Sequence, residues 1–190
     1  MNRVEEVVNM ILAEELYCVL NVHHDAGKGY RWLRADPEAY GEISEQYHAL
    51  WKQIAMRFAH HGERLLFESI NEITDKYSSP MEPRGSIEIK GEAYQVVNAL
   101  NQLFVDTVRE TGGLNAKRNL ICSNYYSSIT KDATAHFVLP TDTVPDHLIA
   151  KVHCYTPYEF TFIDKKHDNA ISVFDERCTK SIDYLYAALK

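Results

Sequence analysis

Short apolar, β-prone runs alternate with amphipathic stretches along the chain, and this alternation constrains the fold more than any other feature. Nearly continuous apolar runs are typical of parallel strands that are buried on both faces. Strands that alternate with helices imply right-handed β-α-β units. The predicted strands are 17–22, 65–70, 119–123 and 148–155, and the predicted helices are 3–15, 40–58, 91–111 and 172–189. The sequence therefore predicts an α/β fold with a parallel sheet, in one domain over residues 1–190.

Composition and charge exclude several classes of protein. The formal net charge of −7 argues against a protein that binds nucleic acid. The sequence contains no run of 18 apolar residues, so it predicts no transmembrane helix. The N-terminal segment is amphipathic and acidic, without the basic-then-apolar order of a secretory signal, so the compartment is left open.

The four cysteines are widely spaced and form no CxxC pair, which gives no zinc or redox motif. Cys18, Cys122 and Cys154 lie in apolar, strand-like runs, where cysteine behaves as a small hydrophobic residue. We expect buried free thiols, with a disulfide as the less favoured alternative.

Polar residues gather where the predicted strands end. Two architectures fit the order of elements: an open doubly wound sheet and a (β/α)8 barrel. The glycine-rich phosphate loops of nucleotide-binding proteins are missing. In a barrel, catalytic residues come from the carboxyl ends of several strands, so the distribution favours the barrel. These residues are Asn21, His23 and His24, then Asn71 and Glu72, then Asn124, Tyr125 and Tyr126, and finally His153 and Tyr155.

Glu72 is the carboxylate best placed for chemistry, because it follows a strand of Leu, Phe and Ile. Partial burial there would raise its pKa, and a raised pKa lets a glutamate donate a proton near neutral pH. The structural alternative is a loop-entry glutamate that caps another element. Asn71 adds a neutral hydrogen-bonding group that suits sugar hydroxyls.

The predicted roles of the histidines depend on their spacing along the strands. His23 and His24 are adjacent, so a regular strand would point them to opposite faces, and a joint metal site is not expected. No HExxH spacing occurs, and we expect neither a metal nor a cofactor. His153 and Tyr155 are two residues apart and would share one face, where they could position an anion or a nucleophile. A buried histidine with satisfied hydrogen bonds is the alternative for His153.

Several aromatic residues lie at loop ends, among them Trp32, Tyr125 and Tyr158. Flat rings suit the faces of sugars, but they equally anchor loops by burial, and the structural role is favoured for any single ring.

Four segments resemble glycoside hydrolase family 5, and more narrowly its bacterial endo-β-1,4-glucanase (cellulase) branch. They are LNVHHDAG at 20–27, LLFESINEI at 65–73, RNLICSNYYSS at 118–128 and KVHCYTPYEF at 151–160. The resemblance implies a retaining glycosidase with a (β/α)8 TIM barrel, of which this chain would be the central portion, about strands 3 to 6.

The resemblance also implies roles for single residues. Glu72 would be the general acid/base, and Asn71 would bind the 2-hydroxyl of the sugar near the scissile bond. His153 and Tyr155 would orient the nucleophile, and His23 would line the −1 subsite. We expect further contacts with substrate from Trp32, Asn21, His24, Tyr125 and Tyr158. Ile73 stands where many members of the family have proline.

The nucleophilic glutamate of the family ends the seventh strand, which has no counterpart in this chain, and neither have strands one, two and eight. Glu68 is four residues before Glu72 on one strand, or roughly 13 Å away, whereas a retaining pair needs about 5–5.5 Å. Glu159 does not match the family position. We therefore expect a chain that binds β-glucan and carries the acid/base half of the site, and that is inactive alone.

Two other interpretations stay open. Four strands leave two open sheet edges, and two copies could close an eight-stranded ring as a homodimer that binds β-glucan without hydrolysing it. The chain could also be an unrelated α/β binding module. The sequence does not choose among cellulose, mixed-linkage glucan, xyloglucan and mannan.

Overall fold

The computed structural model describes residues 2–23, 32–75 and 91–189. Within them, four parallel strands form one sheet in the order β1-β2-β3-β4, so each strand pairs with the next one along the chain. The strands are β1 (Cys18–Asn21), β2 (Leu65–Glu68), β3 (Leu120–Ser123) and β4 (Leu148–Lys151). This order matches four successive strands of a β/α barrel.

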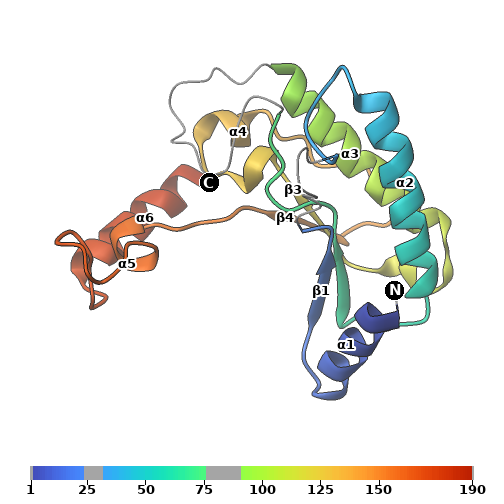
Figure 1. Cartoon of the computed structure of the whole chain (residues 1–190), viewed down its shortest axis with the longest axis horizontal. Coiled ribbons are helices and arrows are strands. Elements are labelled where there is room, and N and C mark those ends of the chain that lie inside the picture. The colour runs from blue at the N-terminus through green and yellow to red at the C-terminus, as the bar shows by residue number, and fades with distance from the viewer. Residues whose placement is uncertain (1, 24–31, 76–90, 190) are drawn as a thin grey trace.

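Helices occupy the segments between the strands. The helices are α1 (Asn2–Ala13), α2 (Tyr40–Arg57), α3 (Gly91–Glu110), α4 (Lys131–Ala135), α5 (Tyr158–Thr161) and α6 (Glu176–Leu189), with short 3-10 helices η1 (Gly113–Lys117) and η2 (Tyr125–Ser127). Figure 1 shows α2 and α3 side by side on one face of the sheet, whereas α5 and α6 lie to one side of it.

The hydrophobic core lies between the sheet and the α2–α3 pair. Trp51 of α2 is fully buried, with its ring 4.5 Å from that of Phe104 of α3 and 5.6 Å from that of Phe67 of β2. Aromatic side chains dominate burial in such cores. Phe67 therefore faces the helices, and its neighbour Glu68 faces the opposite side of the sheet, since successive strand residues alternate.

On that opposite face each strand carries an apolar residue followed, two residues further along, by a polar one. Register pairs Val19 with Leu66 and Asn21 with Glu68, and it pairs Ile121 with Ile149 and Ser123 with Lys151. Between β2 and β3, Glu68 pairs with Ile121. The polar residues lie at the carboxyl ends of the strands, directly beneath the residues that follow them.

Two buried arginines fix the segment after α3. Arg118 is 2% exposed and donates to the carbonyls of Phe58, His61, Gly62 and Leu65, which ties η1 to the turn before β2. Arg109 forms a two-pronged ion pair with Asp142, with both side chains nearly buried. Together these contacts hold the amino ends of β2, β3 and β4 in place.

The predicted strands and helices are confirmed, with shifted ends. The fourth strand ends at Lys151 rather than at residue 155, and the last helix begins at Glu176 rather than at 172. The third helix ends at Glu110, one residue before its predicted end, and Gly112 and Gly113 follow it with positive φ. The short elements η1, η2, α4 and α5 were not predicted, because pieces of three to five residues carry little periodicity.

The cysteines are free, as expected, but one is placed differently from the prediction. Cys18, Cys122 and Cys178 are buried, whereas Cys154 is exposed because it lies beyond the end of β4. Burial raises the pKa of the Cys122 thiol to about 12, which suits packing and not a nucleophile. Among the described helices, none is long and apolar enough to cross a membrane.

Candidate functional site

Glu72 and His153 meet at the carboxyl edge of the sheet. Oε1 of Glu72 lies 2.6 Å from Nδ1 of His153, and the two side chains are 18% and 29% exposed. Glu72 follows β2 and His153 follows β4, so β3 lies between their strands. The distance lies within hydrogen-bond reach, which is the geometry that proton transfer between two side chains requires.

The turn after β3 brings these two residues together. Ser127 has a left-handed backbone (φ 48°). Its hydroxyl donates to the carbonyl of Asn71 at 2.9 Å, and its backbone carbonyl accepts from the N–H of His153 at 2.7 Å. Tyr126 donates its N–H to the carbonyl of Ile73. The η2 turn therefore links the segment after β2 to the segment after β4. Sequence reasoning missed Ser127, because only its place between two site segments distinguishes it from other loop serines.

Asn101 of α3 supports the same edge from the helix side. It is fully buried, accepts from the Ser69 hydroxyl at 2.6 Å, and donates to the carbonyl of Ser123 at 2.9 Å. The Tyr47 hydroxyl donates to the carbonyl of Ser69. Asn101 was also missed, although a lone asparagine inside the apolar face of a helix is a usable signal, since buried amides need partners.

Asn71 is 3% exposed and directly precedes Glu72, and its contact with a sugar hydroxyl stays a prediction. His23 Nδ1 is 3.2 Å from Nδ2 of Asn21. Tyr155 is 51% exposed, and its ring stands edge-on to Phe162 at 5.6 Å.

Tyr155 and His153 do not lie on a strand, because β4 ends at Lys151. The prediction that they share one strand face is therefore wrong. The chain leaves the sheet after Lys151, where the N–H of His153 binds the η2 turn instead of a neighbouring strand.

The aromatic residues that were predicted to contact the substrate lie in different parts of the structure. Tyr125 is buried, its hydroxyl accepts from the N–H of Asp75, and its ring stands edge-on to Tyr94. Trp32 packs against the core, with its Nε1 buried and unbonded in the described structure. His24 lies outside the described residues.

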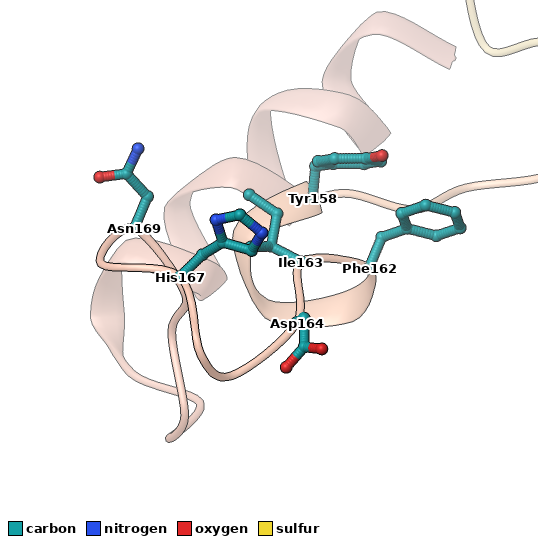
Figure 2. Close-up of a pocket in the computed structure, with 6 residues that line it drawn as sticks. All are labelled: Tyr158, Phe162, Ile163, Asp164, His167 and Asn169. Carbon is teal, nitrogen blue, oxygen red and sulfur yellow. The ribbon is translucent and has the colours of Figure 1, made fainter. Parts of the chain in front are cut away.

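Tyr158 lines a pocket of about 340 Å³ in the C-terminal segment. Its ring stacks on Phe162 at 4.9 Å, and Ile163, Asp164, His167 and Asn169 complete the lining (Figure 2). An aromatic wall with a carboxylate and an amide suits a sugar. This pocket lies on α5 and the loop that follows, and α5 lies to one side of the sheet (Figure 1), whereas Glu72 follows β2.

Among the described residues, one group of side chains has the donors for a metal: Glu5, His60 and His61. It lies at the amino end of β2, whereas Glu72 follows the carboxyl end. Glu5 is already paired with Arg57, whose positive charge disfavours a cation there.

The described residues define four successive units of a parallel β/α barrel with a glutamate–histidine pair at the carboxyl ends of its strands. The family model for cellulase (glycosyl hydrolase family 5) matches residues 1–188, and the chain belongs to this family. It is a partial barrel, because the solved family members that it matches contain about twice its length.

Three relatives illustrate the similarity. The xyloglucan-specific endo-β-1,4-glucanase of Bacteroides ovatus is 38% identical over 164 residues, which are 86% of this chain and 30% of that protein. A family 5 enzyme of Prevotella bryantii B14 has a TM-score of 0.84 at 38% identity, over 98% of this chain and 51% of its own. A broad-specificity endoglucanase of Ruminococcus champanellensis, solved with bound cellotriose, has a TM-score of 0.83 at 36% identity, over 99% of this chain and 51% of its own.

Proposed function

We propose that this chain supplies the acid/base half of a retaining endo-β-1,4-glucanase site, with Glu72 as the proton donor and acceptor. The observation that carries the proposal is the 2.6 Å contact between Glu72 and His153 beside Asn71, at the carboxyl edge of the sheet. The relatives' names support a β-1,4-glucan backbone as the substrate, since they include xyloglucan-specific and broad-specificity endoglucanases.

In the proposed reaction, Glu72 protonates the glycosidic oxygen as the bond to the leaving sugar breaks. It then takes a proton from the water that hydrolyses the glycosyl-enzyme. When Glu72 is ionised it can only accept, so Nδ1 of His153 carries the shared proton. When Glu72 is protonated on its other oxygen, Oε1 still accepts from Nδ1, so His153 holds the carboxyl group in place through both halves of the cycle and leaves that proton for the glycosidic oxygen.

The proposed nucleophile comes from outside the four described strands. A retaining pair of carboxyl groups is about 5–5.5 Å apart. Glu68 lies four residues before Glu72, and its Oε1 accepts from Lys151 Nζ at 2.7 Å and from Asn21 Nδ2 at 2.8 Å. These two contacts give Glu68 a structural role within the sheet.

A chimeric barrel tests the proposal. Residues 1–190 would replace the matching half of the Prevotella bryantii enzyme, which supplies the remaining strands. We expect hydrolysis of β-1,4-glucan, and we expect Glu72→Gln to lower kcat by about 10²–10⁴-fold, the usual contribution of general acid catalysis. With dinitrophenyl cellobioside the first step should be spared, because that leaving group departs without a proton.

Glu63→Gln is the matched control, because Glu63 is exposed on the turn before β2. A folded chimera whose Glu72→Gln variant degrades glucan at the original rate would contradict the assignment of Glu72. So would a folded chimera, shown by circular dichroism and a cooperative melt, that has no activity with the unaltered segment.

The second candidate is a homodimer that binds β-glucan without hydrolysing it. In the described sheet, β1 and β4 each pair on one side only. Val19 and Ile149, on the face away from the helices, are 49% and 42% exposed. Open edges and exposed apolar side chains favour association. Light scattering of the chain at micromolar concentration tests this: a dimer supports it, and a monodisperse monomer overturns it.

A further inference from the structure

We propose that Asn21 and Glu68 are positioning residues that fix the proton of the His23 ring on Nε2. This rests on the proposed function, in which His23 lines the subsite that holds the sugar to be cleaved. The basis is a continuous series of contacts at the carboxyl ends of the strands, from Lys151 through Glu68 and Asn21 to His23.

In the first two hydrogen bonds of this series, the donor and the acceptor can be assigned in one way only. Lys151 Nζ carries donors and no acceptor, so Oε1 of Glu68 must accept from it at 2.7 Å. Oε1 also lies 2.8 Å from the side-chain amide of Asn21. Because that oxygen accepts, the atom of Asn21 that faces it must be the donor Nδ2 and not Oδ1.

The orientation of Asn21 then decides the state of His23. The same Nδ2 lies 3.2 Å from Nδ1 of His23, and an amide nitrogen can only donate. Nδ1 must therefore accept, and in the neutral imidazole the proton resides on Nε2. Asn21 is the last residue of β1 and His23 lies two residues beyond it, so the contact joins the end of the strand to the segment that follows.

The Glu68–Lys151 end of this series is enclosed, and the Asn21–His23 end is exposed. The side chains of Glu68 and Lys151 are 8% and 18% exposed, so water competes little for their contacts. A charged pair inside a sheet needs a reason, since barrel interiors are filled mostly by branched apolar side chains. Orienting Asn21 is such a reason.

NMR of the ¹⁵N-labelled chain tests the proposal without any need for catalysis. Long-range correlations from the ring protons report which nitrogen of a neutral histidine is protonated, and His23→Gln assigns the signals. We expect the Nε2–H form in the unaltered chain above pH 7.5 (about one unit above the ordinary histidine pKa). In the double variant Asn21→Asp/Glu68→Gln the tautomer should reverse to Nδ1–H, because a carboxylate at position 21 can only accept from the ring and the amide at position 68 can donate to it.

Variants of Glu68 separate positioning from general support. Glu68→Gln keeps an acceptor oxygen for Asn21 and should keep the Nε2–H form, whereas Glu68→Leu frees Asn21 to turn over and should give a mixture of tautomers. The double variant Asn21→Asp/Glu68→Gln changes almost no volume and puts no two carboxylates together, so it remains informative if Glu68→Leu unfolds. Glu63→Gln is the control that should change nothing.

Two results would overturn the inference: an Nδ1–H ring in the unaltered chain, or an Asn21→Asp/Glu68→Gln variant whose ring stays Nε2–H. Neither result bears on Glu72. Conversely, loss of the proposed glucanase function in the chimeric barrel would leave the tautomer measurement unaffected, so the two proposals can fail separately.

Discussion

Oε1 of Glu72 and Nδ1 of His153 lie 2.6 Å apart, although 81 positions separate the two residues in the chain. The contact depends on Ser127, which binds the carbonyl of Asn71 and the N–H of His153 from one tight turn. The pair is therefore positioned by the backbone of three successive strand ends and not by the two side chains alone. The following predictions test this site and the fold that supports it.

The 190-residue chain alone should release no reducing sugar from carboxymethyl cellulose. A retaining glycosidase needs a second carboxyl group close to the first, and Glu68 is held by Lys151 and Asn21. A reducing-sugar assay of the purified chain checks this. Turnover at ordinary enzyme rates that disappears in Glu72→Gln would show that a nucleophile is present within the chain.

Replacing Asn101 should loosen the carboxyl edge of the sheet. Asn101→Leu leaves the Ser69 hydroxyl and the Ser123 carbonyl without their buried partner, at about 1–3 kcal/mol for each group. Urea unfolding measures the loss. Asn98→Leu is the matched control on the same helix, because its contacts with His136 and Val138 are exposed, and its cost should be clearly smaller. Equal costs would argue against a special role for Asn101.

Trp51 should be the most costly aromatic residue to truncate. Trp51→Ala leaves a large cavity between α2, α3 and β2, since the ring is fully buried against Phe67 and Phe104. The expected loss is about 3–5 kcal/mol of unfolding free energy. Tyr184→Ala, at a ring that is 80% exposed, should change stability by less than about 0.5 kcal/mol. Thermal or urea unfolding of both variants decides between these outcomes.

The Arg109–Asp142 pair should make stability depend on pH in the acidic range. Burial alone would raise the pKa of Asp142, but hydrogen bonds and charge from Arg109 outweigh it and hold the pKa below the ordinary value of 3.8. The folded state thus favours the ionised form, and its contribution is present above pH 4 and is lost as the pH falls through the lowered value.

Asp142→Asn should cost on the order of 3 kcal/mol near neutral pH, because it leaves Arg109 buried without its charge partner. The difference in unfolding free energy between the two proteins should then shrink on acidification. Urea unfolding between pH 7 and pH 2.5 checks the sign, and a difference that stays constant over this range would contradict the assignment.

Much of the fold could be predicted from sequence, because strand and helix periodicities are local. The four strands and four long helices occur where apolar runs and helical spacing place them. The errors lie at the ends: the fourth strand was extended to Tyr155, yet it stops at Lys151, since Val152 and the residues after it find no neighbouring strand to pair with. Such ends depend on contacts with distant segments, which the local sequence does not encode.

The candidate site, too, could be predicted from the sequence only in part. The sequence by itself determined that Asn71, Glu72 and His23 follow strand ends, because residue type and position along each run are visible in one dimension. It placed His153 inside the fourth strand, which ends before it at Lys151. Only the tertiary structure decided that Glu72 meets His153, that Tyr125 is buried, and that Ser127 and Asn101 hold the edge together. Those facts depend on the lateral order of the strands and on one left-handed turn, and both arise from packing between segments that lie far apart in the chain.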